Sequence, residues 1–199
     1  MRILSWNVQY GKSVNSGSDF SRTLDYIKSL GNFDIICLQE VARHMTAYCT
    51  QEQPDQCQLA QQYFPNHIAL WGSGYSWPSA TSNPKDRQEF GNLTLVKDPL
   101  LDFKVHQLPQ PAALGKWQMP RVAIEACINS KMGPLSIINT HLAYHDGNEA
   151  QLQLEHLQAI ELDRLAHLKY PKAHGPGCFQ EGYLASARIL CGDFNFDPK

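Results

Sequence analysis

The sequence lacks a basic excess. Its 17 lysines and arginines are outnumbered by 19 aspartates and glutamates, which gives a formal net charge of −2. A protein dedicated to long nucleic acids usually carries a basic patch or stripe, because neutralising phosphates supplies most of its affinity. The charge balance therefore gives no reason to assume a long polymer partner, and it leans slightly against long DNA.

Long apolar runs and recognisable cysteine patterns are also missing. No apolar run approaches the roughly 20 residues that a membrane-spanning helix needs, and Met1 and Arg2 lead directly into a strand-like run rather than a signal peptide. Cys49 and Cys57 leave a disulfide or metal pair open, but their spacing matches no zinc pattern and no second pair follows. We interpret all six cysteines as reduced thiols, and we predict a cytoplasmic protein without an obligate protein partner.

The motifs of several enzyme classes do not occur. The chain has neither a Gly-x-Ser-x-Gly elbow nor a phosphate-binding loop. His141 and His145 are four residues apart, but Leu142 stands where a metalloprotease carries its glutamate. These absences argue against a serine hydrolase, a P-loop enzyme and a zinc enzyme.

What the sequence does contain is an alternation of short apolar runs with amphipathic stretches. Its 199 residues suffice for one domain with a sizeable core. The apolar runs predict strands at 2–8, 34–39, 67–72, 91–97, 121–129, 134–141 and 186–192. Helical periodicity predicts helices at 18–30, 56–64 and 148–168. The pattern indicates a single domain of the α/β or α+β class.

The helix ends and the loops can also be predicted. We expect Ser18 or Asp19 to cap the first helix and Asn148 to cap the third. In the third helix, Glu161 interrupts the apolar stripe formed by Leu154, Leu157, Leu165 and Leu168. Stretches with glycines, prolines and small polar residues predict loops at 73–90, 106–120 and 170–183.

Polar side chains stand at the ends of four predicted strands. The segments are Ser5-Trp6-Asn7, Leu38-Gln39-Glu40, Asn139-Thr140-His141 and Gly192-Asp193-Phe194-Asn195. A carboxylate such as Glu40 is a hard oxygen ligand that suits Mg²⁺, which accepts one or two protein carboxylates together with substrate phosphate. The four strand ends therefore predict one site for metal-assisted hydrolysis of a phosphoester.

Each of these residues also has a structural interpretation. Asn7 and Asn195, taken singly, are more often turn residues that bond their own backbone. Asp193 and Glu40 are as readily capping or salt-bridge residues, and His141 alone is more often a structural histidine. In the functional interpretation, the carboxylates bind metal and orient water, while the amides and the imidazole donate to phosphate or the leaving group. Their joint occurrence at four strand ends favours the functional interpretation.

The four segments, in this order, resemble the motifs of the endonuclease/exonuclease/phosphatase superfamily. This group includes deoxyribonuclease I-like nucleases, abasic-site endonucleases, inositol polyphosphate 5-phosphatases and neutral sphingomyelinases. The resemblance extends from Arg2 to Asn195, and Phe90-Gly91-Asn92-Leu93 is similar to the family's Gly-Asn strand entry. It implies a four-layer α/β/β/α sandwich of the deoxyribonuclease I type, with the site at one edge of two sheets.

The resemblance also implies roles for individual residues. Glu40 would be the ligand of Mg²⁺, or of Mn²⁺, with Asn7 in the metal shell. Asp193 would position the attacking water, while Asn195 and His141 would contact the scissile phosphate.

Two further residues, Arg121 and Asn92, are candidate substrate contacts, although Arg121 is equally well explained as a surface arginine at a strand edge. The substrate class stays open among nucleic acid, nucleotide, phosphoinositide and phospholipid headgroup. Aromatic side chains at Trp71, Tyr75 and Trp77 would suit stacking on a base or contact with a headgroup, although such residues more often pack locally.

The sequence departs from the family pattern at its end. Members carry a further Ser-Asp-His motif, whereas no Asp-His dipeptide occurs in these 199 residues, and His145-Asp146 has the reverse order. We interpret this as a truncation of the fold at its C-terminal end, with a divergent or partner-completed protein as the alternative. Loss of the histidine should lower the rate by ~10²–10⁴. We therefore expect a Mg²⁺-dependent phosphodiesterase or nuclease, or else an inactive phosphate-binding or scaffold module of the same fold.

Overall fold

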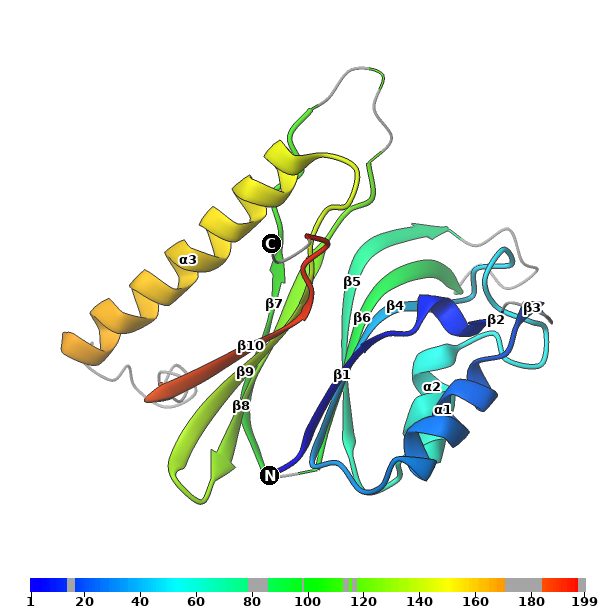
Figure 1. Cartoon of the computed structure of the whole chain (residues 1–199), viewed down its shortest axis with the longest axis horizontal. Helices are drawn as coiled ribbons and strands as arrows, with labels where there is room; N and C mark the ends of the chain where they lie inside the picture. Colours follow the sequence, from blue (N-terminus) through cyan, green and yellow to red (C-terminus); the bar gives the residue numbers. More distant parts are fainter. Residues whose placement is uncertain are drawn as a thin grey trace.

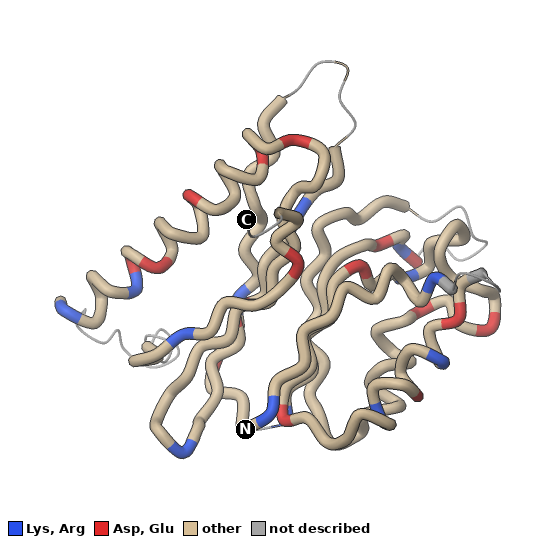
Figure 2. The backbone as a smooth tube through the Cα atoms, in the orientation of Figure 1, with Lys and Arg blue, Asp and Glu red and all other residues tan. Residues whose placement is uncertain are grey.

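Two facing β-sheets with helices on their outer faces make up the structure (Figure 1). This computed structural model describes residues 1–13, 17–78, 86–97, 99–112, 115, 118–170 and 184–196. The arrangement confirms the predicted α+β class and the four-layer α/β/β/α sandwich. Lys and Arg residues are interspersed with Asp and Glu along the described chain, without a basic stripe (Figure 2).

The first sheet is covered by two helices from the N-terminal half. Across the sheet, its strands are β1 (Ile3–Asn7), β4 (Ile35–Arg43), β6 (Arg87–Val96) and β5 (Ile68–Pro78). β1 is parallel to β4, and the other pairs are antiparallel. The helices are α1 (Phe20–Ser29) and α2 (Gln56–Tyr63). Apolar side chains of α1 and β4 pack together in the layer between them. A 3-10 turn, η1 (Gln9–Gly11), and a small hairpin of β2 (Lys12–Ser13) and β3 (Gly17–Ser18) link β1 to α1.

The second sheet repeats this plan with one long helix. Across the sheet, its strands are β10 (Ala187–Asp193), β9 (Gly133–His141), β8 (Val122–Ser130) and β7 (Leu100–Gln107). β10 is parallel to β9, as β1 is to β4 in the first sheet. The outer face is covered by α3 (Gly147–Lys169). Leu157 of this helix packs against Ile138 and Leu142. Each sheet therefore has one parallel pair, whose strand ends meet at the same edge of the sandwich.

A buried network of amides joins the two sheets. Gln39 and Asn139 are almost fully buried, and Gln39 Nε2 donates to Asn139 Oδ1 at 2.7 Å. Asn139 Nδ2 in turn lies 3.2 Å from the carbonyl oxygen of Leu38, 3.1 Å from that of Leu93 and 3.2 Å from Thr94 Oγ1. Because these partners belong to β4 and β6, Asn139 fixes how β9 lies across the first sheet.

The helix ends differ in detail from the prediction. Asp19, rather than Ser18, caps α1 by accepting a hydrogen bond from the backbone of Arg22 at 3.1 Å. The prediction that Asn148 caps α3 is wrong, because Asn148 lies inside the helix, which begins at Gly147. Asp146 is the N-cap, and its side chain accepts a hydrogen bond from the backbone of Asn148 at 3.0 Å. A carboxylate at this position satisfies a free N–H and complements the helix dipole.

The irregular stripe of α3 has a structural reason. Glu161 forms ion pairs with Arg164 at 2.6 Å and with Arg188 of β10 at 2.7 Å. Leu165 and Leu168 remain exposed. The apolar packing of α3 is therefore confined to its N-terminal part, and an ionic contact replaces it near Glu161.

Part of the loop prediction is wrong. Residues 73–78 belong to β5, residues 87–90 belong to β6, and β7 occupies 100–107, so that the loop predicted at 106–120 begins inside a strand. Residues 79–85 and 171–183 lie outside the described residues, and with them most of the loop predicted at 170–183. Of the cysteines, five are described and free, and Cys178 lies outside the described residues. No helix in the described part of the chain is long and apolar enough to cross a membrane.

Candidate active site

Glu40 is presented by an irregularity in β4. The pairing of β4 with β6 shifts between Leu38 and Val41, and Glu40 within this bulge has a φ of 58°. Such left-handed backbone is uncommon for a residue other than glycine and concentrates at functional sites. The bulge re-aims the side chain from the sheet toward the edge of the sandwich.

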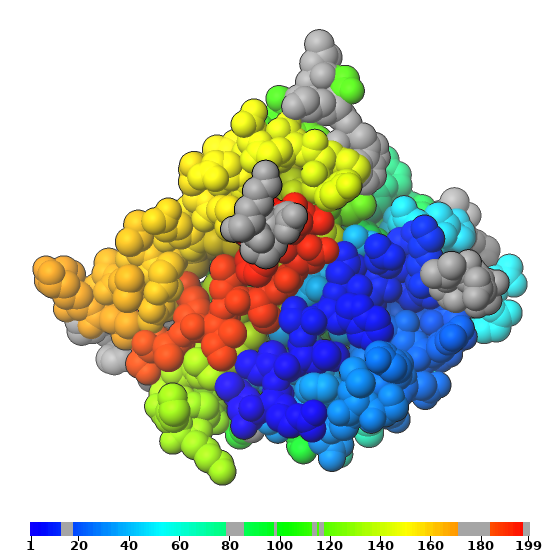
Figure 3. All heavy atoms as spheres, in the orientation of Figure 1, coloured from blue at the N-terminus to red at the C-terminus, as the bar shows by residue number. Residues whose placement is uncertain are grey.

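Two carboxylates from opposite sheets converge on one amide. Asn7 Nδ2 donates to Glu40 Oε1 at 3.0 Å and to Asp193 Oδ2 at 2.8 Å, while Asn7 Oδ1 accepts from the backbone of Gln9 at 3.0 Å. The N-terminal and C-terminal segments that carry Asn7 and Asp193 lie side by side on the face in Figure 3. The structure thus brings together three residues that lie at three separate strand ends in the sequence.

The segment after β10 is held by its own backbone geometry. The backbone N–H of Asn195 donates to Asp193 Oδ1 at 3.0 Å, and that of Leu142 donates to the carbonyl of Asp193 at 2.9 Å. Gly192 has a φ of 146°, and a Cβ there would lie 1.9 Å from the carbonyl oxygen of Thr140. Only glycine fits this close approach of β10 to β9, so Asp193 is placed by a backbone contact.

His141 lies beneath the two carboxylates and is almost fully buried. Arg121 Nη1 lies 2.9 Å from its Nδ1. Because a guanidinium only donates, Nδ1 must accept and the remaining proton belongs to Nε2. Nε2 lies 3.7 Å from Asp193 Oδ2 and 3.9 Å from Glu40 Oε1. The amide nitrogen of Asn195 lies 2.9 Å from Nε2 and 2.9 Å from the carbonyl oxygen of Leu142. Because Nε2 carries the proton, this amide donates to Leu142 and not to the imidazole.

The electrostatic surroundings keep His141 neutral. Burial, reinforced by the guanidinium of Arg121, lowers the pKa of His141 from 6.5 to about 3, against the opposing effect of Asp193. A neutral imidazole whose Nε2–H faces the carboxylates can donate a hydrogen bond to a phosphoryl oxygen without adding a charge.

Arg121 directly precedes β8 of the second sheet, and Asn92 lies in β6 of the first sheet. Arg121 is buried, burial lowers the pKa of its guanidinium, and within the described part of the chain its Nε has no hydrogen-bond partner. This burial is at odds with a surface arginine. Asn92 is 2% exposed and donates to the carbonyl of Val122 at 2.8 Å. Its amide nitrogen therefore ties the sheets together, while a substrate contact for Asn92 stays a prediction.

The oxygen donors fit a hard divalent cation. The described residues include no group of three or more His, Cys, Asp and Glu side chains arranged to hold a metal ion by themselves. Mg²⁺, however, usually takes one or two carboxylates and completes its shell with water and substrate phosphate. Glu40 and Asp193, drawn together by Asn7, offer such a set.

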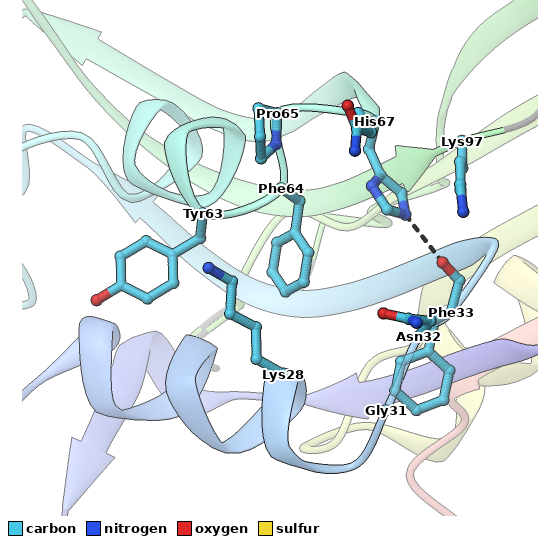
Figure 4. A pocket seen from close by; sticks show the side chains of 10 residues that line it. Lys28, Gly31, Asn32, Phe33, Tyr63, Phe64, Pro65, His67 and Lys97 are labelled. Atoms are coloured by element: carbon cyan, nitrogen blue, oxygen red, sulfur yellow. Dashed lines mark hydrogen bonds between the residues drawn. The ribbon is translucent and has the colours of Figure 1, made fainter.

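A pocket of about 340 Å³ at the other end of the first sheet is separate from this group. It lies where α1 and α2 end, and Lys28 points toward the rings of Tyr63 and Phe64 (Figure 4). His67 Nε2 lies 3.0 Å from the carbonyl oxygen of Phe33. None of the predicted site residues lines this pocket.

The sequence interpretation did not identify Gln39 and Asn139 as site residues. Gln39 directly precedes Glu40, and Asn139 precedes His141 by two positions, so their network supports the backbone that presents both groups. The available signal was the presence of a buried amide inside each otherwise apolar strand.

Neutral His141 leads to a pH prediction. Since its folded pKa of about 3 lies below the unfolded value of 6.5, the unfolded chain binds more protons between these values, and the free energy of unfolding should fall as the pH drops through this window. From pH 7 to pH 5, the wild type should lose about 1–2 kcal/mol more than His141→Gln. Urea unfolding at both pH values measures this, and equal losses would contradict the assignment.

Comparison with known proteins places the chain in a family. The sequence profile described as the Endonuclease/Exonuclease/phosphatase family matches residues 4–199. The chain belongs to the endonuclease/exonuclease/phosphatase family. Among curated proteins, nothing matches.

Solved structures of this family share the fold at low sequence identity. An endonuclease/exonuclease/phosphatase from Beutenbergia cavernae superposes with a TM-score of 0.64 at 16% identity, over 98% of this chain and 47% of that one. D. rerio TDP2 complexed with a single-strand DNA product gives 0.55 at 18% identity, over 98% and 60%. The Bacteroides thetaiotaomicron mannosyl-6-phosphatase Bt3783 gives 0.61 at 14% identity, over 98% and 65%. The chain thus spans about half to two thirds of the length of these family members.

Proposed function

We propose that the protein is a Mg²⁺-dependent phosphoester hydrolase that acts on phosphodiesters. The observation that carries this proposal is the convergence of Glu40 and Asp193 on Asn7, directly above a neutral His141. A carboxylate pair, a proton-donating imidazole and a buried guanidinium are the groups that metal-assisted attack of water on phosphate requires. The family members that include TDP2 with a single-strand DNA product and a mannosyl-6-phosphatase agree with a phosphoester substrate.

Glu40 would hold the metal, and Asn7 would keep its carboxylate in place through the 3.0 Å hydrogen bond. Mg²⁺, or Mn²⁺ in its place, supplies Lewis-acid polarisation of the phosphoryl oxygen and neutralises its charge. The amide oxygen of Asn7 is held by Gln9, so we assign Asn7 the role of orienting Glu40 and Asp193 rather than that of a direct ligand.

Asp193 would orient the attacking water and accept its proton. Asn7 holds one carboxylate oxygen and the backbone of Asn195 holds the other, so the carboxylate has a fixed direction. His141 Nε2–H and the amide of Asn195 would donate to the phosphoryl oxygens. Arg121 fixes the tautomer of His141 and places a positive charge beneath the phosphate.

The alternative is a module of the same fold that binds phosphate without hydrolysing it. Retention of both Glu40 and Asp193 argues against this alternative, because a binding module needs neither a metal carboxylate nor a water-positioning one.

The test is hydrolysis of bis-p-nitrophenyl phosphate across a Mg²⁺ titration, on this chain and on any longer natural form of the protein. We expect turnover that depends on Mg²⁺ and is lost in Glu40→Gln, with this chain slower by ~10²–10⁴ than a form that supplies the final histidine. Binding of p-nitrophenyl phosphate that is independent of Mg²⁺, without turnover in either form, would instead support the module.

A further inference from the structure

The edge that carries the candidate catalytic groups continues into an aromatic pocket. Asn7, Glu40, His141 and Asp193 stand on the paired strands β1/β4 and β9/β10. In the first sheet, β4 is followed by β6 and then β5, and in the second sheet β9 is followed by β8. At that position lies a pocket of about 170 Å³, lined by Met45, Tyr48, Tyr75, Phe90, Gln118, Met119 and Pro120.

Its walls adjoin the candidate phosphate contacts in the chain. Phe90 stands two residues before Asn92, on the same face of β6, because side chains alternate along a strand. Pro120 directly precedes Arg121, whose guanidinium contacts His141. A residue of the pocket wall is therefore the chain neighbour of the arginine that we place beneath the phosphate.

Two bulges aim groups toward this edge from either side of Gly91. β4 shifts register between Leu38 and Val41, the latter opposite Gly91, and this shift presents Glu40. β5 shifts between Ser73, opposite Gly91, and Tyr75, opposite Phe90. A Cβ on Gly91 would lie 1.9 Å from the carbonyl oxygen of Gly72. Gly91 thus permits the close approach of β5 that sets Tyr75 opposite Phe90, and it stands opposite Val41, next to the bulge that presents Glu40.

The aromatic wall is rigidly supported. Tyr48 stacks on Tyr10 with ring centroids 4.2 Å apart and lies 5.7 Å from the ring of Phe90. The buried side chain of Gln56 donates to the carbonyl oxygens of Tyr10 at 2.9 Å and Tyr48 at 3.3 Å, and accepts from the backbone of Ala42 at 2.9 Å. A pocket that is ordered before binding loses little entropy when a ligand enters.

We infer that this pocket receives a flat aromatic group carried on the phosphoester, as a nucleobase is carried on a nucleotide. The inference rests on the proposed function, because it places the phosphate beside Arg121 and His141. Aromatic faces bind bases by stacking, whatever the base. The amide nitrogen of Gln118 donates to the carbonyl oxygen of Pro111 at 2.7 Å and to Glu149 at 3.1 Å, so the amide oxygen of Gln118 and the tyrosine hydroxyls supply the few polar groups that orient a ligand in an apolar pocket. The substrate class is accordingly a nucleotide or nucleic-acid phosphoester rather than a phosphorylated sugar or inositol.

Calorimetric titration with adenosine 5′-monophosphate, ribose 5-phosphate and adenosine, each with Mg²⁺, tests the inference. The wild type should bind the nucleotide at least about tenfold more tightly than ribose 5-phosphate, and Tyr75→Ala should remove most of this difference without changing ribose 5-phosphate binding. Trp77→Ala is the matched control, since Trp77 is exposed on the same strand and does not line the pocket. Tyr75→Leu serves as a second variant: it keeps a large apolar side chain, which preserves packing, but it removes the aromatic ring, so it should lose the same preference for the nucleotide.

The outcomes separate the pocket from the catalytic proposal. Equal binding of nucleotide and ribose 5-phosphate, or equal losses in Tyr75→Ala and Trp77→Ala, would overturn the inference. Hydrolysis of bis-p-nitrophenyl phosphate would leave the proposed function intact in that case. Conversely, adenosine binding that depends on Tyr75 supports the pocket. If ribose 5-phosphate does not bind in the same experiment, that second result counts against the phosphate site and not against the pocket.

Discussion

Replacing Asp193 by alanine should lower the rate of Mg²⁺-dependent phosphodiester hydrolysis by about 10²–10⁴-fold, the range typical of losing a positioned acid–base group. Both oxygens of this carboxylate are held, one by Asn7 at 2.8 Å and the other by the backbone of Asn195 at 3.0 Å. It therefore has a defined direction in which to orient water. Because this interaction forms with the reacting water, kcat should fall while KM changes little.

A carboxylate away from the edge provides the control. Asp163 on α3 has a side chain that is 72% exposed and forms an i,i+4 contact with His167 at 3.8 Å. Asp163→Ala should retain the wild-type kcat. If Asp193→Ala kept more than about a third of the wild-type rate, or raised KM alone, the water-positioning role would have to be abandoned.

The clustering of the candidate residues could be predicted because their positions follow from strand order. Asn7 ends β1 and Asp193 ends β10, and each of these strands pairs in parallel with a strand that carries another site residue. Parallel strands place their carboxyl ends at one edge, so polar residues after apolar runs gather there. The apolar runs of β4 and β9 are buried on both faces, which made their ends easy to locate.

The glycines of β5 misled the prediction for a physical reason. Gly72 and Gly74 suggested a loop, but a Cβ on Gly72 would lie 2.7 Å from the side chain of Ile124, and one on Gly74 would lie 2.5 Å from the carbonyl oxygen of Pro120. These glycines permit close packing between the two sheets within an extended strand. Their role depends on contacts with residues of the second sheet and the segment before it, which are distant in sequence, so the local sequence does not reveal it.

The missed strand β7 and the correct cap of α3 illustrate local ambiguity. β7 lies at the edge of its sheet, and Phe103, Lys104 and Val105 in the middle of this strand are exposed. Without a buried face, its sequence carries little periodic signal. Asp146 and Asn148 are both good capping residues, and the choice between them depends on where the chain leaves β9.

Replacing Asn139 by leucine should lower the free energy of unfolding by about 3–5 kcal/mol, because it breaks a buried hydrogen-bond network on both sides. The amide nitrogen of Asn139 contacts the carbonyl oxygens of Leu38 and Leu93, and its oxygen accepts from Gln39 at 2.7 Å. These partners are far from water, so their polar groups would remain unsatisfied in the variant. Guanidinium chloride unfolding at neutral pH measures the loss.

The matched control is Asn129→Leu, the same chemical change on the neighbouring strand β8, where the side chain is exposed. It should alter the free energy of unfolding by no more than about 0.5 kcal/mol. A loss below about 1 kcal/mol in Asn139→Leu would show that the amide network contributes little to stability. A large loss that Gln39→Leu in the same chain partly relieves would show that the cost comes from the unpaired Gln39 amide, and that the stability is contributed by the hydrogen bond between Gln39 of the first sheet and Asn139 of the second.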